Sequence, residues 1–445
     1  MVGEARALEL LERVLKLSPG DQTQAGLTGA RSYLTRFATN YIHQNVAESN
    51  ASLSVEVIFG KKIGAASTND LSEAGLERVV RQATDLARMQ KENPEFVSLP
   101  APQPIPKLDC TVRATAEFTP EDRAAGVKRL VDLAKQHGLE ASGAFSTETR
   151  EVAVVSSLGI RAYDESNLAS LSTVVMSDAG AGWAGQDARD VRAIDPARIA
   201  QTAVQKCLDS GAPQRLDAGE YEVVLEPAAV GTMLVYLGML GFGALGYQEG
   251  RSFLSGKLGQ PIFGPNIDLW DDGLDQAGLA VPFDAEGIPK RKLPLVEGGV
   301  ARNVCYDSYT ANKEPGKSST GHSTGSRSFG PVPMNVFMRA GDATLEQMIA
   351  STERGILVTR FHYVNPVHPV KAIITGMTRD GTFLIEGGRV KHAVKNLRFT
   401  QSIIEALQRV ELIGRERRVQ RGWVGGVCVP ALKVRGFNFT GVTEH

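Results

Sequence analysis

The sequence predicts an α+β fold in two parts: an N-terminal α+β domain with an antiparallel sheet and helices at residues 1–212, and a C-terminal, mostly-β domain at residues 213–445. The chain of 445 residues is long enough for two domains, because domains average roughly 150 residues. In the first part, long clusters of strand-like residues alternate with few helices, which favours antiparallel hairpins over a doubly wound parallel sheet. The second part is rich in Gly, Pro and short strand candidates, which is typical of a sandwich or barrel.

Apolar residues at helical spacing, together with capping residues, predict four helices in the first part. These cover the N-terminal segment up to Ser18 and residues 71–91 with Asp70 and Glu73 as a capping box. The other two are the stretch from Pro120 to Gly138, with Thr119 as N-cap, and residues 196–210, with Asp195 as cap. Strands are expected at residues 31–38, 41–46, 52–59, 63–68, 141–147, 151–156, 160–163 and 168–176. Five prolines between residues 94 and 108 predict an extended connection.

The second part is expected to contain mostly short strands. Their ranges are 220–226, 266–271, 335–339, 355–360, 371–378, 381–385 and 389–398. Short helices are expected at residues 228–240, 344–351 and 400–412, the last with a capping box from Ser402 to Glu405.

The composition gives no indication of a polyanionic or lipid partner. The formal net charge is −1, whereas nucleic-acid binding requires Lys and Arg to be concentrated on one face. We interpret the one dense basic cluster as the solvated end of a helix and its exit loop; it consists of Arg415, Arg417, Arg418 and Arg421. No strongly apolar run of about 18 residues predicts a membrane span, and the charged N-terminal segment does not resemble a signal peptide. We therefore expect a cytoplasmic protein without a nucleic-acid or membrane partner.

The sequence contains no recognisable metal motif. The four cysteines include no C-x-x-C pair, and Cys305 and Cys428 are expected to be small buried residues. The seven histidines include no H-E-x-x-H. His362 and His368 would lie roughly 20 Å apart on one face of a strand, so they could share a metal only if the chain folded back at Asn365 and Pro366.

An unusual loop at residues 314–328 combines small hydroxyl residues, glycines and charges. Backbone of this kind can donate several N–H groups to an anion or an extended peptide. The alternative interpretation is a mobile surface loop. The residues of this possible peptide-contacting loop are Lys317, Ser318, Ser319, Thr320, Gly321 and His322.

Beyond these local patterns, several segments together resemble the TldD/PmbA family along nearly the whole chain. The resemblance is carried by the order and spacing of VEVIFGKKIGAASTNDLSEAGLERVVRQATDLARM (55–89), SSLGIRAYDESNLASLSTVV (156–175), SFLSGKLGQPI (252–262), DLWDDG (268–273), PFDAEGIPKRKLPLVEGGV (282–300), YDSYTANKEPGKSSTGH (306–322), GDATLEQMIASTERGILV (341–358) and FLIEGGRVKHAVKNLRFT (383–400).

The resemblance implies one of two branches. TldD-type members carry H-E-x-x-x-H, whose imidazoles hold zinc while the glutamate acts as general base. The matching stretch here is Pro227-Ala228-Ala229-Val230-Gly231-Thr232, in which Pro227 and Thr232 stand at the histidine positions and Ala228 at the glutamate position. The chain therefore resembles the PmbA/TldE branch, which implies no catalytic residue, no metal ligand and no cofactor in this chain.

By resemblance, the chain is expected to be a non-catalytic subunit that pairs with a TldD-type H-E-x-x-x-H subunit in a heterodimer, with zinc in that partner only. The complex would process small unstructured peptides, and the isolated chain could form a homodimer. The alternative is a self-sufficient peptidase with an unrecognised site, or with a metal held through His322, His362 or His368. A direct role on DNA, which the family's older label of gyrase modulator suggests, conflicts with the near-neutral charge.

Overall fold

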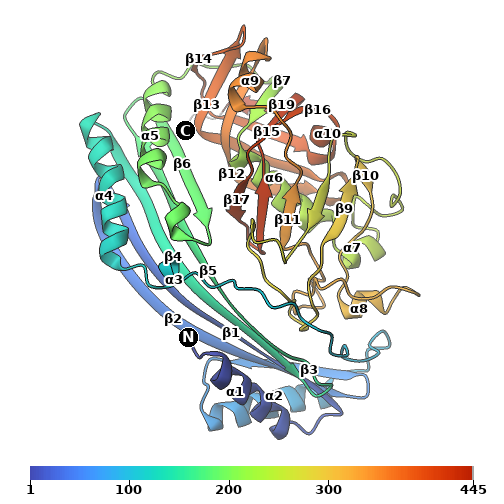
Figure 1. Cartoon of the computed structure of the whole chain (residues 1–445). Coiled ribbons are helices and arrows are strands. Elements are labelled where there is room, and N and C mark those ends of the chain that lie inside the picture. Colours follow the sequence, from blue (N-terminus) through green and yellow to red (C-terminus); the bar gives the residue numbers. More distant parts are fainter. Residues whose placement is uncertain (443–445) are drawn as a thin grey trace.

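The computed structural model describes residues 1–442, and it confirms the α+β fold with antiparallel strands in the first part and mostly β structure in the second. Figure 1 shows one long, curved sheet with helices near both of its ends, and beside it the C-terminal part with its shorter strands. In the described part of the chain, no helix is long and apolar enough to cross a membrane.

The first sheet has six antiparallel strands in the order β3-β2-β1-β4-β5-β6. They are β1 (Gln22–Ala38), β2 (Tyr41–Phe59), β3 (Lys62–Thr68), β4 (Glu140–Ser156), β5 (Arg161–Met176) and β6 (Ala181–Ala188). The predicted break between residues 46 and 52 is wrong, because the polar residues there stay paired with β1, as Asn50 does with Ala30. Strands β4 and β5 are likewise continuous where two pieces each were expected, since each pairs with a neighbour along its length.

Five α-helices accompany this sheet: α1 (Glu4–Leu17), α2 (Glu73–Met89), α3 (Arg113–Ala116), α4 (Pro120–Gln136) and α5 (Pro196–Asp209). Thr119 and Asp195 cap α4 and α5 as predicted. The predicted capping box of α2 is wrong. Ser72 is the N-cap and accepts a hydrogen bond from the Gly75 amide, while the Asp70 carboxylate accepts from the Ser72 amide.

The helices form two separate apolar cores at opposite ends of the first sheet. Helices α1 and α2 cover the end that contains Leu27, Val55 and Ala153. Helices α4 and α5 cover the other end, against Phe145 and Leu171. The sheet is therefore anchored at both ends.

The C-terminal part contains two further sheets. One has the order β10-β9-β8-β11-β18-β17 and the other β12-β7-β19-β15-β13-β14, with β16 paired to β19. The strands are β7 (Gly219–Leu225), β8 (Leu269–Asp271), β9 (Leu293–Glu297), β10 (Val300–Ala301), β11 (Asn335–Met338), β12 (Arg354–His368), β13 (Ile373–Glu386), β14 (Arg389–Ala393), β15 (Leu397–Ser402), β16 (Val410–Ile413), β17 (Arg418–Arg421), β18 (Gly426–Val429) and β19 (Leu432–Val442). The helices are α6 (Pro227–Gly241), α7 (Ala244–Gln248), α8 (Ser308–Ala311), α9 (Leu345–Ala350) and α10 (Ile403–Gln408), and the 3-10 turns are η1 (Val191–Ala193) and η2 (Pro369–Lys371).

The helix expected at residues 400–412 is much shorter, because residues up to Ser402 pair as β15 with β13 and residues from Val410 pair as β16 with β19. Ser402 does cap α10 through the Glu405 amide.

The strands expected at residues 371–378 and 381–385 form one continuous strand, β13, because both pieces pair with β12. The single strand expected at 389–398 is two strands, β14 and the start of β15, and β12 continues to His368, well beyond the expected residue 360. The predicted strands at 220–226 and 335–339 and the helices at 228–240 and 344–351 occur close to their expected ranges, whereas only residues 269–271 of the strand expected at 266–271 are extended.

Helix α6 lies in the core that the two C-terminal sheets share. It contains no charged residue and none of its residues is exposed, as expected for a helix that is apolar on all sides. Its buried residues, such as Met233 and Leu234, join one cluster with Val358 of β12 and Val427 of β18. The position of this helix therefore fixes the two sheets relative to each other.

Ion pairs join the two parts of the chain. Arg327 pairs with Glu56 of β2, Lys206 of α5 pairs with Glu226 at 2.7 Å, and Arg421 of β17 pairs with Glu148 of β4 at 2.9 Å. All six strands of the first sheet precede residue 212 and the strands of the other two sheets follow residue 213. The division into domains at this point stays a prediction.

We expect Leu234→Ala to lower the free energy of unfolding by about 2–5 kcal/mol, because it leaves a cavity where α6 packs between the two sheets. Leu234 is 1% exposed. Leu86→Ala, on the exposed face of α2, is the matched control and should cost much less, since Leu86 is 42% exposed. Urea unfolding of both variants measures the difference, and equal losses would contradict this role of α6.

Candidate functional site

A large cleft of about 1140 Å³ lies between the two parts of the chain. One wall comes from β6 and α5 of the first part. The other comes from β17 and the start of α6, with contributions from the loops around residues 276–278 and 343–346. Strands β6 and β17 are each the last strand of their sheets, so two sheet edges border this cleft.

Residues 227–232, which the sequence resemblance aligns with the zinc motif, form the first turns of α6, and Pro227 and Ala228 line the cleft. The Thr232 hydroxyl donates a hydrogen bond to the Ala228 carbonyl at 3.0 Å. Gln420 of β17 donates its side-chain amide to the Pro227 carbonyl. A Cβ at Gly231 would collide with the same Gln420 amide, so glycine here allows β17 to approach the helix closely.

These residues do not fit a metal ion. Pro227 and Ala228 have no side-chain donor atom, and the Thr232 hydroxyl is committed to the helix backbone. Zinc in proteins is held by Cys, His or carboxylate ligands. Within residues 1–442, no group of three or more His, Cys, Asp or Glu is placed to hold a metal ion.

The carboxylate nearest to this turn in sequence is already engaged. Glu226 is the N-cap residue of α6, and its carboxylate pairs with Lys206 at 2.7 Å while accepting a hydrogen bond from Thr359 at 3.3 Å. Both members of the ion pair are mostly buried, with 14% and 17% of their side chains exposed. This pair links α5 to α6 at the edge of the cleft, which is a structural role.

The basic cluster near the C-terminus is not the end of a helix, which corrects the interpretation from sequence. Helix α10 ends at Gln408, and the cluster lies in the loop before β17 and in β17 itself. Three of its members line the cleft: Arg415, Arg417 and Arg418. From the opposite wall, α5 contributes Arg198. Burial lowers the pKa of Arg418, and the positive charge of Arg198 lowers it further.

In the loop at residues 314–328, the first half is largely exposed, residues 320–323 are buried, and residues 324–328 are again partly exposed. Lys317 and Ser318 are exposed and Ser319 is half-buried, whereas Thr320, Gly321 and His322 are buried. A peptide could therefore touch the first half without any rearrangement. The prediction that this loop contacts peptide remains a prediction.

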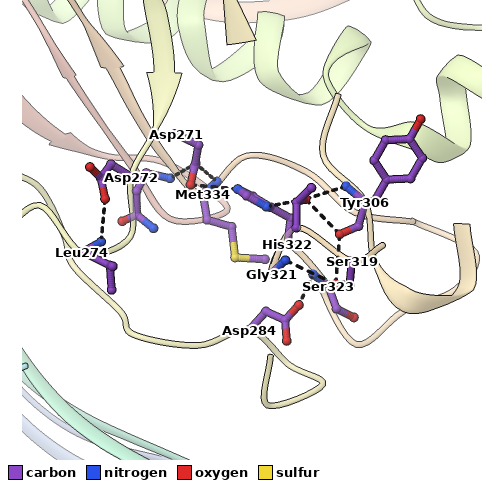
Figure 2. A network of polar contacts seen from close by, with 12 residues as sticks. Asp271, Asp272, Leu274, Asp284, Tyr306, Ser319, Gly321, His322, Ser323 and Met334 are labelled. Atoms are coloured by element: carbon purple, nitrogen blue, oxygen red, sulfur yellow. Dashed lines mark hydrogen bonds and ion pairs between the residues drawn. The ribbon is translucent and has the colours of Figure 1, made fainter. Parts of the chain in front are cut away.

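His322 belongs to a buried polar network instead of an open site (Figure 2). Its Nε2 lies 2.9 Å from Asp271 Oδ1 and its Nδ1 lies 2.9 Å from the Thr320 hydroxyl. Asp271 also accepts hydrogen bonds from the backbone amides of Met334 and Asn335. These hydrogen bonds tie the 314–328 loop to the end of β8.

The pKa values of Asp271 and His322 are both lowered in this network. Burial raises the pKa of Asp271, but His322, Lys290 and the backbone hydrogen bonds lower it more, so that the pKa lies below its usual range. Burial lowers the pKa of His322, and the nearby Lys290 lowers it further. A neutral His322 that donates from Nε2 to an ionised Asp271 satisfies both groups.

A second pair of carboxylates lies in the loop after β8: Asp284, which is buried, and Glu286, which is half-buried. The Asp284 carboxylate accepts hydrogen bonds from Ser323 and Ile288, and Glu286 accepts two from Ser308. Burial raises the pKa of Glu286, and the negative charge of Asp284 raises it further. Glu286 is therefore protonated under conditions where an exposed carboxyl would be ionised.

His362 and His368 both lie on β12, which continues through Asn365 and Pro366 and pairs with β13 there. The chain does not fold back at that point, so the arrangement that a shared metal would require does not form. All four cysteines are free and buried, as expected for Cys305 and Cys428. Burial raises the pKa of Cys305 well above its ordinary value, which disfavours the reactive thiolate.

Sequence reasoning missed Arg198, Lys206 and Gln420 as parts of the cleft wall. Each sits in an ordinary amphipathic helix or short strand, and nothing in its neighbours marks it as part of a site. Only the packing of β6 and α5 against β17 brings them together. The one feature of the sequence that could have indicated this wall is the cluster of arginines at residues 415–421.

Comparisons with known proteins match this architecture throughout. Models of the PmbA/TldA metallopeptidase family match in three successive stretches: domain 1 at residues 27–87, the central domain at residues 114–210 and the C-terminal domain at residues 218–441.

Individual relatives agree with these family models. The metalloprotease PmbA of Escherichia coli O157:H7 is 23% identical over 96% of both chains. The uncharacterized protein MJ0231 of Methanocaldococcus jannaschii is 33% identical over 43% of this chain and 45% of its own length. The crystal structure of TldE from Thermococcus kodakarensis superposes with a TM-score of 0.88 at 22% identity, covering 97% of this chain and 99% of that one.

We expect the stability that Glu286 contributes to fall as the pH rises. The native state keeps the Glu286 proton above the unfolded pKa of about 4.3, so deprotonation favours the unfolded chain by at most about 1.4 kcal/mol per pH unit. Burial raises the native pKa of Glu286 to about 8, so Glu286→Gln, which is neutral at every pH, should gain stability relative to the wild type between about pH 4 and pH 8. Urea unfolding across this range measures it, with exposed Glu353→Gln as control. A pH-independent difference would contradict the protonated state.

Proposed function

The chain belongs to the PmbA/TldD metallopeptidase family, and from this premise we propose that it is a non-catalytic, TldE/PmbA-like subunit. It pairs with a TldD-type H-E-x-x-x-H subunit in a heterodimer that processes small unstructured peptides. Zinc and the hydrolytic step belong to the partner. We expect the complex to act in the cytoplasm.

The single observation that carries this proposal is the chemistry at the start of α6. A zinc peptidase needs ligands and a general base on one helix face beside the substrate cleft. Here the cleft is present, but the corresponding positions hold Pro227, Ala228 and Thr232. Gln420 of β17 packs onto the same turn. The chain has the architecture of a peptide-binding subunit without the groups that would cleave a peptide.

The edges of β6 and β17 support a role in holding peptide. Both strands are at the end of their sheets and border the cleft, and an edge strand presents unpaired N–H and C=O groups. An extended peptide can add to such an edge through main-chain hydrogen bonds, with little demand on its sequence. This mode suits unstructured substrates of varied sequence.

An exposed apolar patch supports a protein partner. We define it as Tyr363, Val367, Val370 and Trp423, whose exposed fractions are 72%, 56%, 42% and 73%. Tyr236 of α6 joins the two segments that form the patch, because its ring packs against Trp423 and its hydroxyl donates to the Val364 carbonyl. Grouped large apolar side chains on a surface mark contact sites for other proteins, and we assign this patch to the catalytic subunit. In its absence a second copy of the chain can cover it, giving a homodimer.

The alternative of a self-sufficient peptidase requires a site in this chain. His322 is fully buried and bonded on both ring nitrogens. His362 and His368 lie on a strand without a third ligand nearby among residues 1–442. None of these histidines lines the large cleft, which makes this alternative the weaker one.

We expect this chain alone to leave an unstructured peptide intact, and a mixture with an H-E-x-x-x-H relative from the same source to cleave it. A chelator should abolish the cleavage, because the hydrolytic water is activated by the metal of the partner. Mass spectrometry of the peptide measures cleavage, and metal analysis of the isolated chain should find less than one equivalent of zinc. Cleavage by the isolated chain after rigorous purification would overturn the proposal.

We expect Trp423→Ser to weaken assembly with the catalytic subunit at least tenfold, because aromatic anchors contribute a large share of interface energy. Val97→Ser is the matched control, since Val97 is also exposed, at 66%, and lies outside the patch. Analytical ultracentrifugation of mixtures measures the dissociation constant. Unchanged assembly of the Trp423→Ser variant would show that the partner binds elsewhere.

A further inference from the structure

The cleft between the two parts of the chain carries more positive charge than its own acidic groups neutralise. Eight Lys or Arg and six Asp or Glu residues line it. Three of the acidic groups are paired inside the chain: Glu226 with Lys206 at 2.7 Å, Asp190 with Arg192 at 2.6 Å and Glu416 with Arg418 at 3.4 Å. Arg113 is paired as well, with Glu117 at 2.9 Å. Among the described residues, the cleft cations without an ion pair are Arg189, Arg198, Arg415 and Arg417, and the cleft carboxylates without one are Asp109, Asp187 and Glu346.

Several of these cations lack an acidic partner of their own. Within residues 1–442, Arg198 forms no ion pair, and its recorded contact is a 3.4 Å hydrogen bond to the Gln186 side chain. Arg417 lies over the rings of Trp270 and Phe337 without forming an ion pair in the described part of the chain. The Nε of Arg189 is buried and has no acceptor among the described residues.

Arg198 and Arg418 line the same cleft from opposite walls, one on α5 and the other at the start of β17. The positive charge of Arg198 lowers the pKa of Arg418, so the two like charges repel. The acidic partner of Arg418, Glu416, is 68% exposed and lies at 3.4 Å. An anion placed between the two would relieve this repulsion.

We propose that Arg198 and Arg418 bind a carboxylate of an extended peptide in this cleft, either its C-terminal carboxylate or an acidic side chain. Guanidinium groups present planar forks that match a carboxylate in a bidentate geometry. The cleft is large enough for several residues of an extended chain, and β6 and β17 provide edges along it. The start of α6 lines the same cleft. A peptide whose carboxylate is bound by the two arginines would therefore lie beside this turn, which has no catalytic group.

This inference rests on the proposed peptide substrate, but it does not depend on the partner subunit. It is therefore tested with the isolated full chain. The probe is an octapeptide of Gly, Ser, Ala and two central Leu residues, labelled at its N-terminus with an uncharged BODIPY dye. Three versions are compared: a free C-terminal carboxylate, a C-terminal amide, and a C-terminal amide with one internal Asp.

Fluorescence anisotropy should show that the free-carboxylate or the Asp peptide binds at least tenfold more tightly than the neutral amide. Their order tells whether the terminus or a side chain is held. Raising NaCl from about 50 to 500 mM should weaken the binding of the charged peptides, since salt screens exposed charges. Equal binding of all three peptides, or no measurable binding of any, overturns the inference.

Arg198→Gln and Arg418→Gln should each remove most of the preference for the charged peptides, while Arg198→Lys should keep part of it because the charge remains. Arg302→Gln is the matched control, because Arg302 is exposed and forms a surface pair with Glu297 at 3.1 Å outside the cleft. Thermal unfolding of each variant shows that it is folded. An undiminished preference in both glutamine variants overturns the assignment.

The two proposals can fail separately. Cleavage by the mixed subunits without any carboxylate preference of this chain would leave the subunit role intact and remove the arginine site. A carboxylate preference of the isolated chain, with no cleavage in any mixture, would keep the site and remove the role as partner of a protease.

Discussion

The structure depends on the burial of α6. This helix has no charged residue and is apolar on all sides, so it is stable only where protein covers it completely. The two C-terminal sheets supply that cover, with β12 on one side and β18 on the other. Pro227 starts the helix directly after β7. The packing of α6 in the core therefore also fixes the position of its first turn, which lines the cleft.

The same constraint explains why the cleft remains although the zinc ligands are absent. The wall is held by contacts that involve no ligand: Glu226 with Lys206, Gln420 with the Pro227 carbonyl, and Arg421 with Glu148. Mostly buried ion pairs are costly to break one partner at a time, because the remaining charge is left without compensation. The shape of the cleft therefore does not depend on a bound metal ion.

The sequence predicted local features well and three-dimensional neighbours poorly. The caps at Thr119 and Asp195 follow from short-range hydrogen bonding, which the sequence displays directly. The long strand β2 was split in two, because its central polar residues look like a turn until β1 pairs with them. Arg198 and Arg418 are separated by more than two hundred residues in sequence and meet only through the packing of the first sheet against β17, which no local pattern encodes.

The 314–328 loop shows why composition alone does not decide between a ligand site and an internal support. Small hydroxyl residues and glycines provide many donors, and these donors go to whichever acceptors are in reach. Here two buried carboxylates are in reach: the Ser323 amide donates to Asp284, and the network of His322 ends on Asp271. The hydrogen-bonding groups of Ser323 and His322 are therefore already used inside the protein. The cleft differs from this loop, because cations such as Arg198 and Arg417 line it without an ion pair among the described residues.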